Sequence, residues 1–135
     1  MAGRIPQILL SELVRENRIS QADVNTLIAD AEKDAKDIGA LIVERGILKD
    51  KELAQFKATL YHLPLADLQE IDSDPAAFKE ISEDVAGFYR VIPFGIGDGV
   101  LKVGLLDPED INALEALKFI AADKNLKLDK YVVSY

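Results

Sequence analysis

The first sixty residues carry one pattern of apolar and turn-forming residues twice, 29 positions apart. In the second copy, apolar residues at helical spacing from Ile38 lead to Gly46, and in the first copy the same spacing leads to Asn17. Gly and Asn readily adopt the left-handed conformation that ends a helix. The pattern therefore predicts two helix hairpins, about residues 8–31 and 37–60, that pack into a four-helix unit.

Capping residues support both hairpins. Ser20 is expected to cap the helix that follows it, with Asp23 reaching back to the backbone in a capping box. Asp50 is expected to cap the last helix, whose buried side would hold Leu53, Phe56 and Leu60. Two unrelated amphipathic hairpins of equal length would also align in part. The coincidence of the turn residue with its apolar neighbours favours a true duplication.

Residues 62–89 read as connecting turns and short helices between two halves of the chain. Asp74 followed by Pro75 predicts a helix start, because Pro is tolerated at the first helical position. From Ser82 onward, we expect a turn over residues 82–89. We take residues 1–61 as a helical subdomain and residues 90–135 as a second one.

Extended periodicity replaces helical periodicity after Arg90. Two β-rich runs are joined by Gly97-Asp98-Gly99, which predicts a hairpin. A helix over 109–125 follows, with an inward stripe of Ile111, Leu114, Leu117 and Phe119 or Ile120. The last run, LDKYVVSY, predicts a third strand. The fold class is therefore α+β: a helical bundle of two repeated hairpins, then a ββαβ unit with one helix packed on a small three-stranded sheet.

Composition and charge exclude several functional classes. The chain has 135 residues, a net charge of −8 and no cysteine, which rules out disulfides, thiolate zinc sites and a cysteine nucleophile. The helix–turn–helix look of residues 37–60 raises the question of DNA binding. The second helix offers Lys49, Lys51 and Lys57, but Asp50 and Glu52 stand among them. An acidic chain repels nucleic acid and anionic lipid, so core packing explains this hairpin better than DNA binding. No apolar run is long enough to insert directly into a membrane.

Candidate catalytic groups are nearly absent from the sequence. His62 is the one histidine, and its place at a helix end suits a cap or a surface residue better than a catalyst. Gly95, Gly97 and Gly99 imitate a phosphate loop, but they join two strands and do not open a helix. We therefore expect no catalytic residue, no metal site and no resident cofactor.

Two stretches of the chain carry motifs in a familiar order. The segment IGALIVERGILKDKELAQFKATLYHLPLADL and the later run ISEDVAGFYRVIPFGIGDGVLKVGLLDPEDINALEALKFI resemble the N-terminal, MshEN-like domain of the type II secretion and type IV pilus assembly ATPases (the GspE/PilB group). The matching residues of the later run are Ala86, Tyr89, Val91, Ile92, Pro93, Leu101, Val103, Asp107, Pro108, Asp110, Ala113, Leu114 and Leu117. The resemblance covers nearly the whole chain.

The resemblance implies a non-catalytic interaction domain. In that family this domain precedes an ATPase core, and it would dock the motor to protein components of the inner-membrane platform. It would be cytoplasmic and held peripherally at the inner membrane through those partners. The parent chain would be the ATPase, and the isolated domain would catalyse nothing.

Some members of the family bind cyclic di-GMP through two tandem copies of a motif that begins R-L-G and ends in Gln. The second copy here keeps Ile38, Gly39, Ile42, Val43, Gly46, Ile47, Leu48 and Leu53. Asp37 stands where the motif has Arg, and Leu60 where it has Gln. The first copy has Ile8 for Arg, Leu10 for Gly, Asn17 for the central Gly and Ala31 for Gln. Because Arg pairs with phosphate and stacks on bases, an acidic replacement disfavours the dinucleotide. Cyclic di-GMP sensing is thus the alternative to the adaptor reading.

Overall fold

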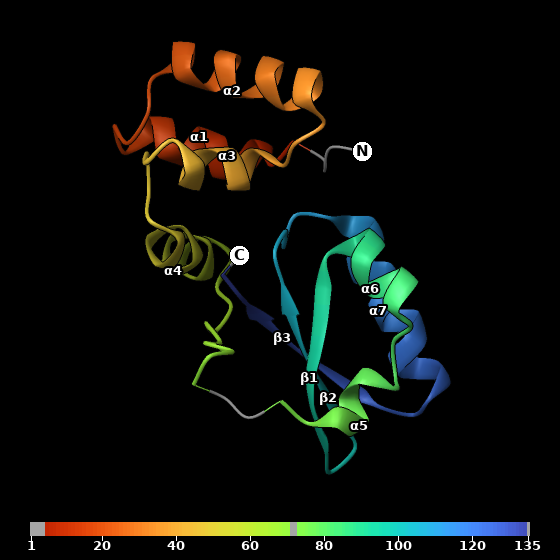
Figure 1. Cartoon of the computed structure of the whole chain (residues 1–135). Coiled ribbons are helices and arrows are strands. Elements are labelled where there is room, and N and C mark those ends of the chain that lie inside the picture. The colour runs from red at the N-terminus through yellow and green to blue at the C-terminus, as the bar shows by residue number, and fades with distance from the viewer. Residues whose placement is uncertain (1–4, 71–72, 135) are drawn as a thin grey trace.

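Helices form the N-terminal half of the molecule. The computed structural model describes residues 5–70 and 73–134. The half comprises α1 (Gln7–Arg15), α2 (Gln21–Asp34), α3 (Ile38–Glu44) and α4 (Asp50–Tyr61). In Figure 1, α1 to α3 lie together at one end, and α4 lies between them and the sheet. The two predicted hairpins are confirmed as α1–α2 and α3–α4.

The turns between these helices follow from single residues. Asn17 and Gly46 end the first helix of each hairpin with φ angles of 59° and 70°. The Ser20 hydroxyl accepts the Asp23 N–H at 3.0 Å, and the Asp23 carboxylate accepts the Ser20 N–H at 3.1 Å. The prediction that Asp50 caps α4 is wrong by one residue. The Lys49 N–H donates to Glu52 at 3.3 Å, so Lys49 occupies the cap and Asp50 is the first helical residue.

One apolar core joins the four helices. Its buried side chains repeat between the hairpins, so that Leu9 and Leu13 of the first correspond to Ile38 and Ile42 of the second. Leu48 and Leu53 connect α4 to this core, and Phe56 and Leu60 pack partly buried against it. Burial of such side chains is the main stabilising term, at about 1.5–3 kcal/mol for each one fully buried.

Two short helices lead into the sheet. Asp74 caps α5 (Pro75–Phe78), and its carboxylate accepts the Ala76 N–H at 2.9 Å. The turn predicted over residues 82–89 is instead α6 (Glu83–Tyr89). Ser82 accepts the Val85 N–H at 3.3 Å, and Glu83 adds negative charge to the first turn, so the local signals are those of a helix start.

The sheet has the order β1-β2-β3. β1 (Val91–Gly97) and β2 (Val100–Leu105) pair antiparallel through a two-residue turn, Asp98-Gly99, with φ angles of 54° and 75°. α7 (Ile111–Asp123) returns the chain to β3 (Lys127–Val132), which pairs parallel to β2. The predicted α+β class and the ββαβ order are confirmed.

The predicted inward stripe of the last helix is wrong at Ile111, and of the alternatives Phe119 and Ile120 it is Ile120 that faces inward. Leu117 is buried, and Leu114 and Ile120 are partly buried against the same core, as expected. Ile111 and Phe119, however, point outward with 66% and 74% of their surface exposed. The helix begins two residues later than predicted, at the Asp110 cap, and small Ala113 and Ala121 take the inward places because α7 lies close to the sheet.

The two halves meet along α4. Its Ala54 and Ala58 pack on Val132 of β3, and all three are 5% exposed or less. The chain then runs beside β3, where the Ala66 N–H donates to the Val132 carbonyl and the Val132 N–H donates to Pro64, each at 2.9 Å. The segment after Tyr61 therefore adds an isolated bridge, between Leu65 and Val132, to the sheet edge.

Replacing Gly104 by alanine should destabilise the sheet half. A Cβ at this buried position would lie 2.4 Å from Cγ1 of Val133, a buried β-branched side chain with little freedom to move. We expect the free energy of unfolding, measured by urea denaturation, to fall by about 1–3 kcal/mol.

Gly97→Ala is the matched control, because a Cβ there meets no heavy atom within 4 Å. Val133→Ala should relieve part of the cost of Gly104→Ala in a double-mutant cycle. Equal losses for the Gly104 and Gly97 variants would contradict the packing argument.

Candidate functional site

The residues predicted to bind a cyclic dinucleotide lie in the helical core and at one turn. Ile38, Ile42, Leu48 and Leu53 are 0–3% exposed, and Gly39 is also buried. Val43 and Ile47 pack partly buried against the same core, and Gly46 forms the exposed turn. Their positions explain their apolar character through packing. Whether any of them contacts a ligand stays a prediction.

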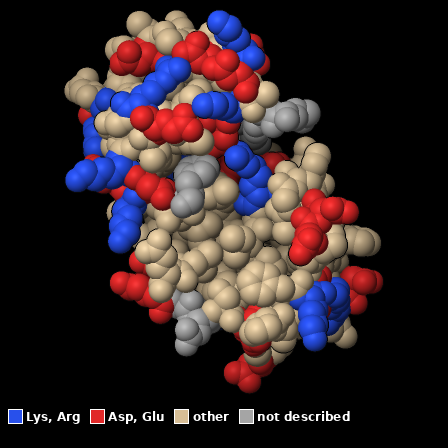
Figure 2. Space-filling view, viewed as in Figure 1, with Lys and Arg blue, Asp and Glu red and all other residues tan. Residues whose placement is uncertain are grey.

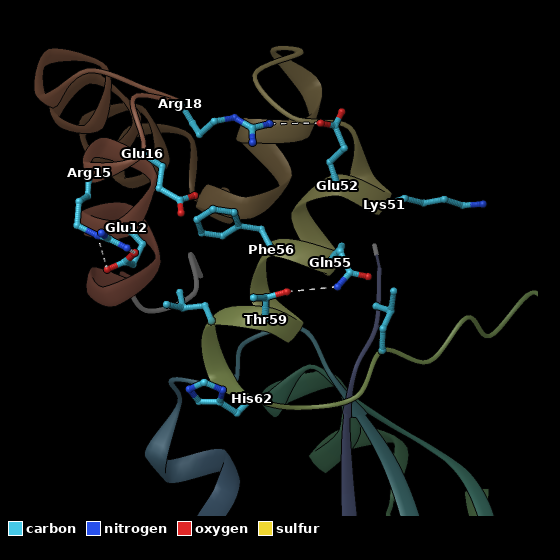
Figure 3. A pocket seen from close by; sticks show the side chains of 12 residues that line it. Glu12, Arg15, Glu16, Arg18, Lys51, Glu52, Gln55, Phe56, Thr59 and His62 are labelled. Carbon is cyan, nitrogen blue, oxygen red and sulfur yellow. Dashed lines mark hydrogen bonds and ion pairs between the residues drawn. The ribbon is translucent and has the colours of Figure 1, made fainter.

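A concave surface lies elsewhere, between α1 and α4 (Figure 3). We call it the α1/α4 groove, and its volume is about 860 Å³. Its lining is formed by Glu12, Arg15, Glu16, Arg18, Lys51, Glu52, Gln55, Phe56, Thr59, Leu60, His62 and Leu65. None of the eight predicted ligand residues is among them. Leu60, at the position of the motif Gln, does line the groove.

Paired charges surround this groove. Arg15 contacts Glu12 at 2.6 Å, and Arg18 contacts Glu52 at 3.3 Å. The hydrogen bond from Arg15 lowers the pKa of Glu12 below its ordinary value. Three carboxylates and three cationic side chains line the groove, so it presents balanced charge. Such exposed pairs contribute little stability.

Asp37, at the motif position of Arg, is engaged inside the molecule. Its Oδ2 accepts the Ala40 N–H at 3.1 Å and caps α3, and its Oδ1 forms an ion pair with Arg90 at 2.5 Å. The Asp37 side chain is only 13% exposed. The carboxylate is therefore committed to the helix start and to Arg90 at the end of α6.

Lys57 is buried at the junction of α4 with the sheet half. It is 4% exposed, and its Nζ donates to the Leu106 carbonyl at 2.8 Å. Burial lowers the pKa of Lys57, and the charges of Asp37 and Asp107 act in the opposite direction. The sequence pattern groups this lysine with Lys49 and Lys51, as cations that a DNA-binding helix would offer. The missed signal is its spacing, four residues after Leu53 and three before Leu60, which puts it on a buried face.

The described residues hold neither a metal-ligating cluster nor a membrane-crossing helix. No group of three or more His, Asp or Glu side chains there is arranged to hold a metal ion. None of the helices in residues 5–70 and 73–134 has the length and apolar character that a bilayer crossing needs.

Fold and site together define a small two-part α+β domain, with a repeated helical hairpin unit placed on a ββαβ sheet. The MshEN domain model matches residues 61–134. The chain belongs to this MshEN domain family, as the N-terminal domains of the GspE/PilB-type ATPases do.

Relatives and solved structures agree with this assignment. The type IV pilus assembly ATPase PilB of Myxococcus xanthus is 30% identical over 120 residues, which is 89% of this chain and 20% of that protein. The chain thus spans about a fifth of the length of this relative. A structure of MshE with cdg has a TM-score of 0.67 at 24% identity, covering 97% of this chain and 90% of that one. The N-terminal domain of XpsE has a TM-score of 0.65 at 20% identity, with 98% and 90% covered. These two structures share the fold.

Lys57→Met should alter the alkaline part of the stability profile. Since the folded-state pKa lies below the ordinary value of 10.5, the folded protein releases this proton first as pH rises. Between the folded-state pKa and 10.5, the unfolded chain holds the Lys57 proton and the folded protein does not. The unfolding free energy therefore rises with pH over this window and falls when pH is lowered through it. We expect the difference in unfolding free energy, wild type minus Lys57→Met, to grow over that window in denaturation series.

Lys51→Met is the control, because Lys51 is exposed on the same helix. The difference should grow more with pH for Lys57→Met than for Lys51→Met. Equal profiles for the two variants would contradict the burial of the Lys57 ammonium group.

Proposed function

We propose that this chain is a non-catalytic adaptor domain of a type II secretion or type IV pilus assembly ATPase. It would work in the cytoplasm and connect the motor to protein components of the inner-membrane platform. Family membership and the similarity to PilB support the choice of machinery. The adaptor role itself draws support from the exposed surface of the sheet half.

The observation that carries the proposal is the outward side of α6 and α7. Phe88 on α6 is 71% exposed, and Ile111 and Phe119 on α7 are 66% and 74% exposed. Both helices pack on the same sheet core, through Val85, Ala86 and Tyr89 of α6 and Leu114 and Ile120 of α7. In Figure 1 both helices lie on the same side of the sheet. Large apolar side chains held outward by well-packed helices suit a protein contact.

Charge indicates the chemistry of the partner. Three acidic residues, Glu83 and Asp84 on α6 and Glu115 on α7, are exposed on the same helices as the apolar residues. Lys118 on α7 is an exposed cation among them. The complementary surface would be a basic, amphipathic one on the platform protein. On the face in Figure 2, charged residues of both signs gather over the helical half, and much of the sheet half is uncharged. The two halves therefore present different surfaces to a partner.

Polar replacement of the exposed rings should weaken docking. We expect Phe88→Ser and Phe119→Ser each to reduce affinity for the purified cytoplasmic domain of the cognate platform protein by about tenfold or more, as truncation of aromatic hot spots does. Isothermal calorimetry measures the affinity. Ile8→Ser removes an exposed apolar side chain from the helical half and is the matched control. Unchanged affinity in both Phe variants would refute docking through α6 and α7.

Cyclic di-GMP sensing is the second candidate, because a structure of similar fold is that of MshE with cdg. The position of the motif Arg argues against it. Asp37 brings a carboxylate to that point, and its partner Arg90 is held by the ion pair. The ligand would lose a cation–phosphate attraction and the stacking surface of a guanidinium plane.

We expect the wild-type chain to give no saturable heat with cyclic di-GMP, even at high ligand concentration. Calorimetry on the double variant Asp37→Arg, Leu60→Gln, which restores the motif residues of the second copy, provides the comparison. Saturable heat in the micromolar range for the wild type would replace the adaptor proposal by a sensor that regulates the same motor.

A further inference from the structure

The loop between β2 and α7 reaches the start of α1. Glu109 in this loop accepts the backbone N–H of Ile8 through Oε1 at 3.1 Å and that of Leu9 through Oε2 at 3.0 Å. The contacts join residues about a hundred positions apart. Pro6, the residue before α1, makes no side-chain capping bond. The cap of α1 is therefore supplied by the sheet half, where a carboxylate meets the positive end of the helix.

Neighbouring groups hold Glu109 in this position. The Tyr61 hydroxyl, at the last residue of α4, donates to Glu109 Oε2. The Glu109 N–H donates to Asp107 Oδ1 at 3.0 Å, which shapes the loop itself. The same carboxylate thus contacts both α1 and α4 and connects them to the loop.

Two further polar contacts cross the junction. Asp37 at the start of α3 pairs with Arg90 at the end of α6, and Lys57 of α4 donates to Leu106 in the same loop as Glu109. The apolar contact across the junction is formed by Ala54 and Ala58 of α4 against Val132, with Leu63 packed beside them. Burial of apolar surface is non-directional, so this contact does not by itself select one orientation.

We propose that Glu109, with Arg90 and Lys57, forms an orientation clasp between the helical half (residues 5–61) and the sheet half (residues 75–134). Hydrogen bonds depend steeply on distance and angle, whereas the apolar contact of Ala54 and Ala58 does not. The clasp therefore selects one orientation of the helical half. Its release allows other orientations while both cores stay folded. The proposal concerns this chain alone and does not depend on the docking partner.

Distance measurements on the whole chain test the clasp directly. The sequence has no cysteine, so spin labels at Asn25→Cys on α2 and Lys118→Cys on α7, both exposed, report one distance between the halves. We expect a single narrow distance distribution with Glu109 present. Glu109→Ala should broaden it or add a second population, and Glu109→Gln should do so to a smaller extent.

Hydrogen exchange supplies the second readout. The amides of Ile8 and Leu9 should exchange about tenfold faster in Glu109→Ala, the scale expected for losing charge-assisted bonds at an exposed helix start. Amides within β2 should keep their wild-type rates. Tyr61→Phe, which removes one bond to the carboxylate, should show a smaller change of the same sign.

Glu115→Gln is the matched control, since it removes the same charge from the exposed side of α7. Its distances and exchange rates should equal those of the wild type. An unchanged distance distribution in Glu109→Gln and in any folded Glu109→Ala protein would overturn the clasp. A lowered unfolding midpoint without a change in distance would overturn it equally, since that result shows only local stabilisation.

Discussion

The rest of the structure depends on α4 having two buried faces. Leu53 and its partly buried neighbours Phe56 and Leu60 belong to the helical core, whereas Ala54 and Ala58 pack on β3. A helix buried on two sides has few places for charge, yet Lys57 lies between the faces and donates to Leu106. Its ammonium group is tolerated because a carbonyl and nearby carboxylates offset the loss of water. The junction of the two halves is therefore both apolar and polar.

The two hairpins use the same apolar positions to build one core. Packing and turn geometry constrain the residues that the two copies share, because each apolar repeat position lies in or against one core. The polar ends of the motif are not constrained in this way. At one such end, Asp37 caps α3 and pairs with Arg90. The position where the motif has Arg therefore contributes to the junction between the two halves.

The packing of α7 on the sheet leaves large apolar side chains outside the core. Inward Leu117 and the small residues Ala113 and Ala121 let α7 lie close to the strands, and the large side chains of Ile111 and Phe119 remain outside. Those side chains add nothing to the core of this domain. Contact of these apolar side chains with water is unfavourable in free energy, and burial against a partner surface would remove that penalty.

The sequence by itself determined the local elements: the turns at Asn17 and Gly46, the Ser20 cap, the Asp98-Gly99 hairpin and the ββαβ order all follow from residues close together in the chain. Residues 82–89 were misassigned as a turn, because a helix and a turn begin with the same kinds of residue. The outward side of α7 was also misassigned, because periodicity does not tell which apolar side chain meets the sheet. Only the tertiary structure decided the burial of Lys57, the capping of α1 by Glu109 and the pairing of Asp37 with Arg90. These contacts join residues that are 49 to 101 positions apart in the chain. No local sequence pattern encodes which distant carbonyl or carboxylate will meet a given side chain.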